Sequence, residues 1–414
     1  MAMNVGYKDS LIGVIPEEWE VRKLSEIGKF SKGAGVRKDE ALSGNIPCVR
    51  YGELYTSHHE YIKTFYSFIS KAIADTSKRL KKGDILFAGS GETKEEIGKC
   101  VAFIDEVEAY AGGDIVILSP EEVESLYLGF LLNAPLIQKQ KASRGQGDAV
   151  VHISATQLGN IIIPIPKEIA EQTAIAEVLS DTDNLIQALE KQIAKKRNIK
   201  QGAMQKLLQP KEGWEVKKLG DLNFDISDGN YSSKYPSSSE FKEFGIPFIR
   251  ANNIKKMTVI DDDMRYISSD LHFELAKGHL KTGDILITTR GEIGKISIVP
   301  QKFVDSNINA QIVRINTNKK INNLYFAYFL QKSETQTILL NLQSGSALKQ
   351  LPVGKLKQLE LVYPSFEEQI RIATILSDID AEIAVLDTTL QKYKMLKLGM
   401  MQNLLTGKIR LIKS

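Results

Sequence analysis

Two similar stretches decide how this chain is organised: EQTAIAEVLSDTDNLI, which begins at Glu171, and EQIRIATILSDIDAEI, which begins at Glu368. They are identical at nine of sixteen positions and lie 197 residues apart. A similarity that returns after a long interval is typical of chains built from repeated structural units. With 414 residues, the chain is long enough for two such units, each with a full hydrophobic core.

The repeat extends well beyond this phrase. Three further pairs recur at intervals of 195 to 200 residues: EWEVRKLSEI at Glu18 with GWEVKKLGDL at Gly213, IPCVRYGEL at Ile46 with IPFIRANNI at Ile246, and LKKGDIL at Leu80 with LKTGDIL at Leu280. Short apolar strands alternate with helical segments between them, which predicts an α+β fold for each half. We expect a pseudo-two-fold repeat with these segments: a globular domain at 1–166, a long helix at 167–209, a second globular domain at 210–364 and a second long helix at 365–414.

Apolar residues in both long helices alternate at spacings of three and four. This spacing is typical of the seam of a coiled coil. The predicted seam residues are Ile175, Leu179, Ile186, Leu189 and Ile193 in the first helix, and Ile372, Leu376, Ile379, Ile383, Leu386 and Leu390 in the second. Lysines interrupt the pattern at Lys196, Lys200 and Lys397.

Charge along the two helices indicates how they pair. Acidic residues gather in the first half of each helix and basic residues in the second half. Such a gradient also complements the macrodipole of a single helix. In a parallel pair like charges would face each other, whereas an antiparallel pair sets acid against base. We therefore expect an antiparallel coiled coil.

Composition excludes several classes of protein. No run of eighteen apolar residues occurs, so we expect no membrane span. The N-terminal stretch MAMNVGYKDS does not resemble a signal peptide, and Cys48 and Cys100 are the only cysteines, which favours a cytoplasmic location. The net charge of +3 is compatible with binding to nucleic acid.

Catalytic motifs are missing from the sequence. GETKEEIGK and GEIGK resemble a phosphate-binding loop, but the first glycine and the hydroxyl residue after the lysine are absent. The five histidines and two cysteines have no metal-ligand spacing. We therefore expect neither an enzyme nor a metal site in this chain.

Two unlike α+β domains, each followed by the EQ…IA…LSD phrase and a long helix, resemble the specificity subunit of a type I restriction-modification system. The resemblance implies that each domain recognises one half of a bipartite site in double-stranded DNA. It implies that the helices bind two modification (methyltransferase) subunits and the restriction subunits. S-adenosylmethionine and ATP with Mg²⁺ would then serve those partners, and this chain would hold no cofactor. Because the halves differ, we expect an asymmetric target.

Polar residues in matching loops are the candidate DNA contacts. Arginine pairs with guanine, asparagine or glutamine with adenine, and lysine with phosphate. The candidates are Arg50, Lys94, Lys99, Arg144 and Gln146 in the first domain, and Arg250, Asn252, Asn253, Arg290, Lys295, Ser346 and Lys349 in the second. Each of these residues also fits a structural role in a turn or as a solvated surface charge.

A second interpretation stays open at this point. The chain could be a standalone DNA-binding or scaffold protein, built by repetition, that self-associates through its coiled coil. One further feature concerns assembly: Gly202 and Gly399 occupy equivalent helical positions. Glycine costs roughly 1 kcal/mol there relative to alanine. We therefore expect a close backbone approach, either between the two helices or by a bound subunit.

Overall fold

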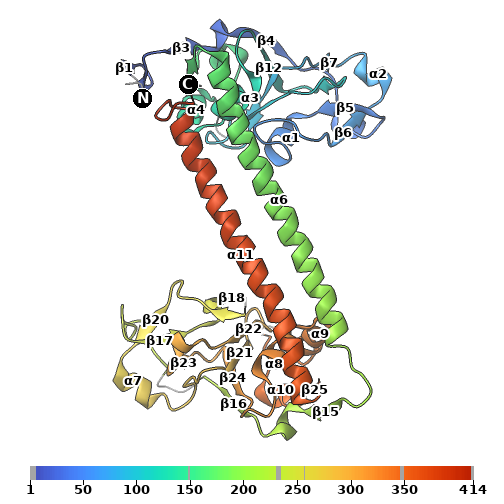
Figure 1. Ribbon diagram of the computed structural model, residues 1–414, viewed down its shortest axis with the longest axis vertical. Coiled ribbons are helices and arrows are strands. Elements are labelled where there is room, and N and C mark those ends of the chain that lie inside the picture. The colour runs from blue at the N-terminus through green and yellow to red at the C-terminus, as the bar shows by residue number, and fades with distance from the viewer. Residues whose placement is uncertain (1–5, 148–149, 230–234, 256, 346–348, 412–414) are drawn as a thin grey trace. The chain divides into compact units, whose positions relative to one another are not determined.

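The computed structural model describes residues 6–147, 150–229, 235–255, 257–345 and 349–411. The chain forms two compact units, 1–190 with 388–414 and 191–387 (Figure 1). Each unit contains a mixed α/β globular domain and parts of both long helices, which confirms the expected fold class. None of the helices in the described ranges is long and apolar enough to cross a membrane.

The first domain is built on a four-stranded antiparallel sheet. Its strands, in spatial order, are β10 (Cys100–Ala102), β8 (Ile85–Ala88), β12 (Ile115–Pro120) and β4 (Gly28–Lys32). Successive side chains of β8 enter different hydrophobic clusters: Ile85 and Phe87 one cluster, Leu86 and Ala88 another. A strand buried on both faces reads as a continuous apolar run, which explains the ILFA sequence.

A second sheet of the first domain contains β6 (Ser67–Ile69), β5 (Ile46–Val49), β11 (Tyr110–Ala111) and β7 (Lys78–Arg79). Strands β5 and β11 are parallel and the other neighbours are antiparallel. The remaining short elements of the first domain are β1 (Tyr7–Ser10), β2 (Gly13–Pro16), β9 (Ser90–Gly91), β13 (Val151–His152), α1 (Tyr51–Thr56), α2 (Lys71–Ala74) and α5 (Ala155–Gly159).

The second domain repeats this strand order. Its larger sheet contains β16 (Asp225–Asp228), β24 (Ile312–Asn316), β21 (Ile285–Thr288) and β22 (Ile296–Ile298). The smaller sheet contains β20 (Arg265–Ile267), β17 (Ile246–Ile249) and β23 (Asn307–Ile308), again with one parallel pair, β17 and β23. Its remaining short elements are β18 (Ile254–Lys255), β19 (Thr258–Val259), α7 (Ser269–Glu274) and α10 (Val353–Leu356).

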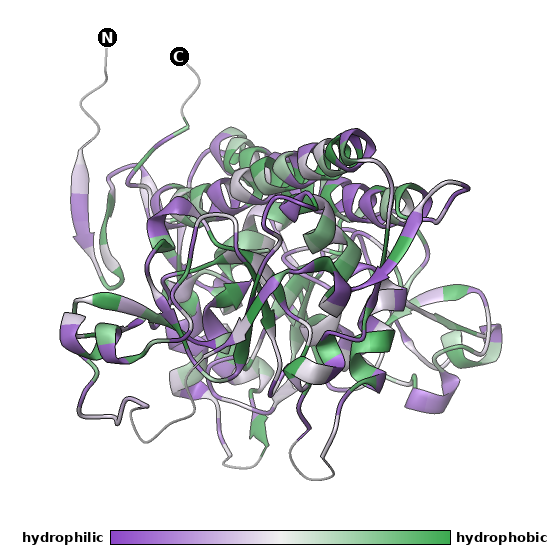
Figure 2. Cartoon of the chain, turned by 90° about the horizontal axis from the view of Figure 1, so that it is seen from below, coloured by the Kyte–Doolittle hydropathy of each residue, from purple (hydrophilic) through white to green (hydrophobic). Residues whose placement is uncertain are grey.

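Two consecutive helices accompany the larger sheet of each domain, and the first of each pair is largely buried. They are α3 (Ser125–Leu131) and α4 (Pro135–Arg144) in the first domain, and α8 (Asn323–Gln331) and α9 (Ser333–Asn341) in the second. α3 contacts β10, and α8 contacts β22. Hydrophobic residues concentrate on strands and helices, whereas the outlying loops are largely hydrophilic (Figure 2).

The repeated phrase joins each domain to its long helix. Gln172, 1% exposed, donates through Nε2 to the carbonyl of Pro166 at 2.8 Å and accepts from the amide of Glu124 at 2.8 Å. Gln369 makes the same two hydrogen bonds in the second domain. Pro166 ends β14 (Ile162–Pro166), which pairs with β3 (Trp19–Lys23), as β25 (Glu360–Tyr363) pairs with β15 (Glu215–Lys218). The glutamine of the repeated phrase therefore fixes the start of each long helix onto its domain.

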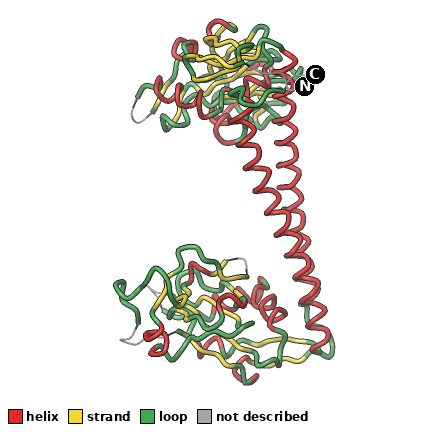
Figure 3. Tube along the Cα trace, turned by 60° about the vertical axis from the view of Figure 1, so that its left-hand side comes forward, coloured by secondary structure: helices red, strands yellow, loops and turns green. Residues whose placement is uncertain are grey.

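The long helices are α6 (Ile169–Leu207) and α11 (Phe366–Leu404), each of 39 residues and drawn without a break (Figure 3). At 1.5 Å per residue each measures roughly 58 Å. Nine of the eleven predicted seam residues are buried, and Ile379 and Leu386 are half-buried.

The helices pair antiparallel within each unit. In the first unit Asp183 and Glu190 of α6 lie 2.7 Å from Lys397 and Lys394 of α11, respectively. In the second unit, Lys200 lies 2.7 Å from Asp380 and Arg197 3.2 Å from Asp387. Residue numbers rise along one helix as they fall along the other. Acid meets base, as the charge gradient predicts.

After α11 the chain turns at Gly407, whose φ of 72° is the left-handed conformation common just after helices. Arg410, which follows this turn, contacts the first unit: its Nη2 lies 2.8 Å from a carboxylate oxygen of Glu171. Glu171 also accepts from Trp19 Nε1 at 3.3 Å. The repeated phrase of the first unit therefore also holds the C-terminal segment.

Candidate nucleic-acid interface

In the second domain, two loops that are distant in sequence meet at Arg290. Arg290 forms a β-bridge with Gln350, and its Nε donates to the side-chain oxygen of Gln350 at 3.1 Å. Gln350 and Ser344 exchange two backbone hydrogen bonds and close a hairpin. The strand-end turn after β21 and the loop before α10, both predicted as DNA contacts, therefore lie side by side.

The first domain has the same arrangement with different side chains. Here Ser90 of β9 pairs with His152 of β13, and Ser90 Oγ lies 2.9 Å from His152 Nδ1. Gln146 and His152 exchange the two backbone hydrogen bonds that close the hairpin. A groove of about 760 Å³ runs beside this pair and is lined by Ser90, Gln146, His152 and Lys32, among others.

One position thus carries Ser-His in one domain and Arg-Gln in the other. Ser90 and Arg290 are separated by 200 residues, the same interval that separates the two GDIL strands. Sequence reasoning selected Arg290 but not Ser90, His152 or Gln350. The interval between the GDIL strands was the signal that could have identified Ser90.

Arg50 and Arg250 lie at equivalent places and are partly satisfied within the protein. Arg50 is about one-third exposed, and its Nε donates to Ser67 Oγ at 3.1 Å. Arg250 Nη2 lies 2.8 Å from an oxygen of Asp263. The hydrogen bond from Arg250, followed by its charge, lowers the pKa of the Asp263 carboxyl. DNA would have to compete with these partners for either guanidinium.

Asn253 is placed where it cannot contact a base. It is fully buried, its Oδ1 accepts from the amide of Arg250 at 3.0 Å, and its Nδ2 donates to the carbonyl of Asp262 at 2.8 Å. The side-chain amide of Asn253 is therefore used to close the turn, and in this conformation it is not free to pair with a base. The neighbouring Asn252 is exposed and remains a candidate.

Two lysines of the first domain differ in their surroundings. Lys94 is exposed, whereas Lys99 is half-buried and donates to the carbonyl of Tyr55 at 3.0 Å. Burial lowers the pKa of Lys99, although Glu60 and Glu96 oppose that shift. Because Lys99 lines a cavity with Glu60, Glu95 and Glu96, its setting is less suited to a phosphate than that of Lys94.

The other candidates are Arg144, Lys295, Lys349 and Ser346. Arg144 donates to the carbonyls of Gln140 at 2.9 Å and Asn160 at 3.3 Å, so its guanidinium caps the end of α4. Lys295 lies 2.6 Å from Glu292. Lys349 is exposed beside the Arg290–Gln350 bridge. Ser346 lies outside the described residues.

Comparison with known proteins agrees with this architecture. The type I restriction-modification DNA specificity domain matches residues 16–197 and again 211–394. The protein named as the specificity subunit of the MjaX type I restriction enzyme of Methanocaldococcus jannaschii is 30% identical, over 98% of this chain and 96% of that protein. The MjaVIII specificity subunit of the same organism is 28% identical, over 96% and 94%.

A solved structure shares the fold. The crystal structure of the type I restriction-modification S subunit from M. genitalium superposes with a TM-score of 0.63 at 16% identity, over 98% of this chain and 97% of that one. The two tandem domains and paired helices define a two-domain DNA-recognition subunit. The chain belongs to the type I restriction-modification DNA specificity family, as a specificity subunit with two target-recognition domains.

Proposed function

We propose that this chain reads a bipartite, asymmetric site in double-stranded DNA, one half-site with each globular domain. The observation that carries the proposal is the matched pair of loops. Equivalent positions hold Ser90 with His152 in the first domain and Arg290 with Gln350 in the second. Side chains with different hydrogen-bonding patterns select different bases. Unequal half-sites follow from this difference.

The long helices support a fixed interval between the half-sites. Half-sites one turn of DNA apart lie roughly 34 Å centre to centre. Helices of roughly 58 Å are long enough to connect readers at that interval. The antiparallel seam and its ion pairs in each unit support a role of these helices as a spacer.

The long helices are also the proposed binding surface for two modification (methyltransferase) subunits and for the restriction subunits. Their outer faces keep large apolar side chains in solvent, including Ile199 of α6 and Met395 and Leu398 of α11, which are 46%, 69% and 52% exposed. Exposed apolar patches on a helix favour a protein partner. The exposed positions occur on both helices, which suits two copies of one subunit.

In this proposal the chain performs no catalysis. Adenine methylation with S-adenosylmethionine, and restriction driven by ATP with Mg²⁺, belong to the partner subunits. The chain itself needs no cofactor for DNA recognition.

Base-resolution methylation mapping tests the proposal. Cells would express the chain together with the modification subunit encoded beside it. We expect methylated adenines at one asymmetric two-part motif with a constant gap, and no such marks when the chain is deleted. Methylation that persists without the chain would reject the specificity role. Stable self-association in that case would favour the alternative, a repeat-built DNA-binding or scaffold protein.

A further inference from the structure

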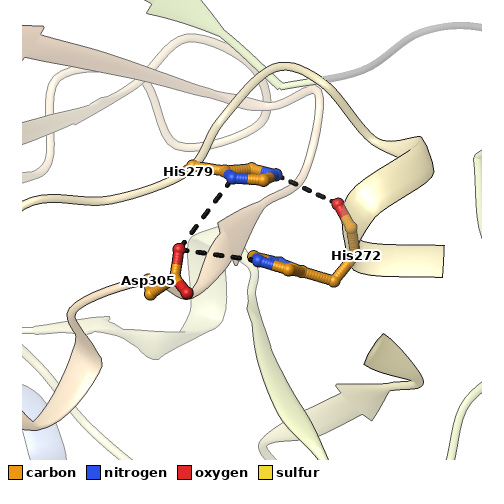
Figure 4. A group of neighbouring side chains, drawn as sticks. All are labelled: His272, His279 and Asp305. Carbon is orange, nitrogen blue, oxygen red and sulfur yellow. Dashed lines mark hydrogen bonds and ion pairs between the residues drawn. The ribbon is translucent and has the colours of Figure 1, made fainter. Parts of the chain in front are cut away.

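The second domain holds a cluster of three potential metal ligands that the proposed DNA recognition does not use. His272 lies in α7, His279 lies between α7 and β21, and Asp305 precedes β23 (Figure 4). One ligand atom from each residue lies within 4.8 Å of the other two. Asp305 Oδ1 is 3.5 Å from His272 Nε2 and 3.9 Å from His279 Nδ1.

Backbone hydrogen bonds hold this cluster together. The amide of Asp305 donates to the carbonyl of Leu280 at 2.8 Å, and the amide of Leu280 donates to the carbonyl of Ser306 at 3.0 Å. His279 immediately precedes Leu280, so its backbone is held beside Asp305. Asp305 has a φ of 61°, a left-handed conformation that aspartate tolerates better than most residues.

The hydrogen bonds of the outer ring nitrogens assign both imidazole tautomers. His279 Nε2 lies 3.0 Å from the carbonyl of His272 and 2.9 Å from that of Leu275. Since carbonyls only accept, Nε2 carries a proton, and Nδ1 of the neutral ring presents a lone pair. The side-chain oxygen of Asn307 accepts from His272 Nδ1, so His272 Nε2 also presents a lone pair.

Two nitrogen lone pairs and a carboxylate therefore face one another in a small volume. A metal cation among these groups, or a proton on one imidazole, relieves the repulsion between them. Outer nitrogens that donate to a carbonyl or an amide oxygen are the usual support of metal-binding histidines. We propose that His272, His279 and Asp305 bind a divalent transition-metal ion of the zinc class, for which imidazole and carboxylate are suitable ligands.

Binding of such an ion requires the ligand atoms to move closer together and one ring to reorient. Tetrahedral Zn²⁺ with bonds of about 2.0–2.1 Å sets its ligand atoms about 3.4 Å apart. The rings of His272 and His279 are stacked, with centroids 4.1 Å apart. Because a bound metal lies near the plane of each imidazole, one ring has to tilt. His279 is the ring that can, since its side chain is 35% exposed whereas that of His272 is 3% exposed.

The site would be open to solvent at its fourth position. The Asp305 side chain is 71% exposed, so water completes a tetrahedron of three protein ligands. A bound ion would link α7 and the segment after it to the edge of the smaller sheet. That link would fix one wall of the second domain without any contact to DNA.

The first domain does not repeat the whole cluster, although Glu108 lies two residues before Tyr110 as Asp305 lies two residues before Asn307. β5 pairs Cys48 with Tyr110, and β17 pairs Phe248 with Asn307, so Tyr110 stands where Asn307 does. Arg79 immediately precedes Leu80, as His279 precedes Leu280, and arginine is not a metal ligand. The ion is therefore expected once per chain. Spacing along the sequence gave no sign of it, because the ligands are seven and 26 residues apart and only folding brings them together.

Calorimetric titration of ZnCl₂ into the full chain, first treated with a chelator, tests the site. We expect one Zn²⁺ per chain in the wild type. His279→Ala and Asp305→Asn should weaken binding on the order of tenfold or more. His59→Ala, which removes an exposed histidine of the first domain, is the matched control and should bind zinc as the wild type does.

A second measurement separates loss of binding from loss of folding. Zn²⁺ should raise the Tm of the wild type and of His59→Ala, but not that of the two site variants, whose metal-free circular dichroism should match the wild type. The proposal is overturned if the wild type binds no zinc, or if both site variants bind it as tightly as the control. The cluster would then be an ion pair between a protonated histidine and Asp305. DNA recognition by the domains does not depend on either outcome.

Discussion

Lys397 of α11 places its ammonium 2.7 Å from the Asp183 carboxylate of α6, at one of the polar interruptions of the apolar seam. Glu60 of the first domain lies 2.8 Å from the same ammonium. The second unit repeats the pair as Lys200 and Asp380. A buried polar pair in a coiled coil favours the one register in which both partners meet. The lysines that interrupt the heptads therefore specify the alignment of the helices.

Replacing Lys397 with methionine should destabilise the first unit by about 3 kcal/mol, because two largely buried carboxylates lose their cation. Burial opposes the charge of Lys397, but Glu60 and Asp183 raise its pKa above the ordinary value. The ion pair therefore stabilises the fold below the ordinary lysine pKa and is lost as pH rises through the higher folded value. Urea denaturation at neutral pH measures the effect.

The matched control is Lys394→Met, one turn away on the same helix. Lys394 pairs with Glu190, and both side chains are 46% exposed, so its loss should cost less than about 1 kcal/mol. Equal losses for the two variants would mean that burial of the Lys397 pair is not what stabilises the register.

Because of Lys141, we expect the free energy of unfolding to increase with pH between about 8 and 10.5. Lys141 is completely buried in α4, where its Nζ donates to the carbonyl of Gly98 at 2.7 Å. Burial lowers the pKa of Lys141 to about 8 from 10.5. Between those values the unfolded chain binds more protons than the folded one, so stability increases with pH, by roughly 3 kcal/mol in total.

Lys141→Met should abolish this increase. The second domain supports an apolar replacement. Leu339 lies five residues before Ser344, where the hairpin of that domain begins, as Lys141 lies five residues before Gln146. Leu339 is also fully buried. Urea denaturation of both proteins at several pH values from 8 to 10.5 makes the comparison. Parallel pH profiles for wild type and variant would show that Lys141 remains charged in the folded protein.

The fold could be predicted from the sequence wherever the repeat supplied two independent versions of one element. The paired GDIL strands and the heptads of α6 and α11 are such cases. Individual DNA contacts were harder to predict, because a polar residue in a loop has the same sequence signature whether it faces solvent or closes a turn. Asn253 and Arg144 both complete local hydrogen bonding. Ser90 and His152 meet only through a long-range strand pairing.

Arg290→Ala should relax base preference at one position of the second half-site and cost about 1–3 kcal/mol of binding. Lys349→Ala should instead weaken binding to all sequences and reduce the salt slope by about 1. Fluorescence anisotropy of the complex on duplexes with single base changes, at several salt concentrations, separates the two effects.

Lys302→Ala is the control for these DNA-binding variants, because Lys302 is an exposed lysine of the same unit that pairs with Asp261. It should leave both affinity and salt slope unchanged. A uniform loss for Arg290→Ala, with base preference intact, would reassign that residue to phosphate contact. An altered preference in the first half-site would contradict the assignment of one half-site to each domain.

Gly202 and Gly399 do not mark a close approach of α6 to α11. A Cβ built on either glycine meets no atom within 4 Å, so that part of the sequence-based expectation is wrong. Alanine at each position should therefore stabilise the isolated chain by about 1 kcal/mol through helix propensity alone. Thermal unfolding of the single alanine variants measures this gain.

The open space at both glycines favours the other expectation, a partner subunit whose backbone comes close to these helices. The double variant Gly202→Leu/Gly399→Leu should then fold normally but fail to retain the modification subunits on gel filtration. Gly354→Leu is the control, because Gly354 also has no atom near its Cβ position but belongs to α10 and not to a long helix. Complete assembly by the double leucine variant would place the docking surface on other faces of α6 and α11.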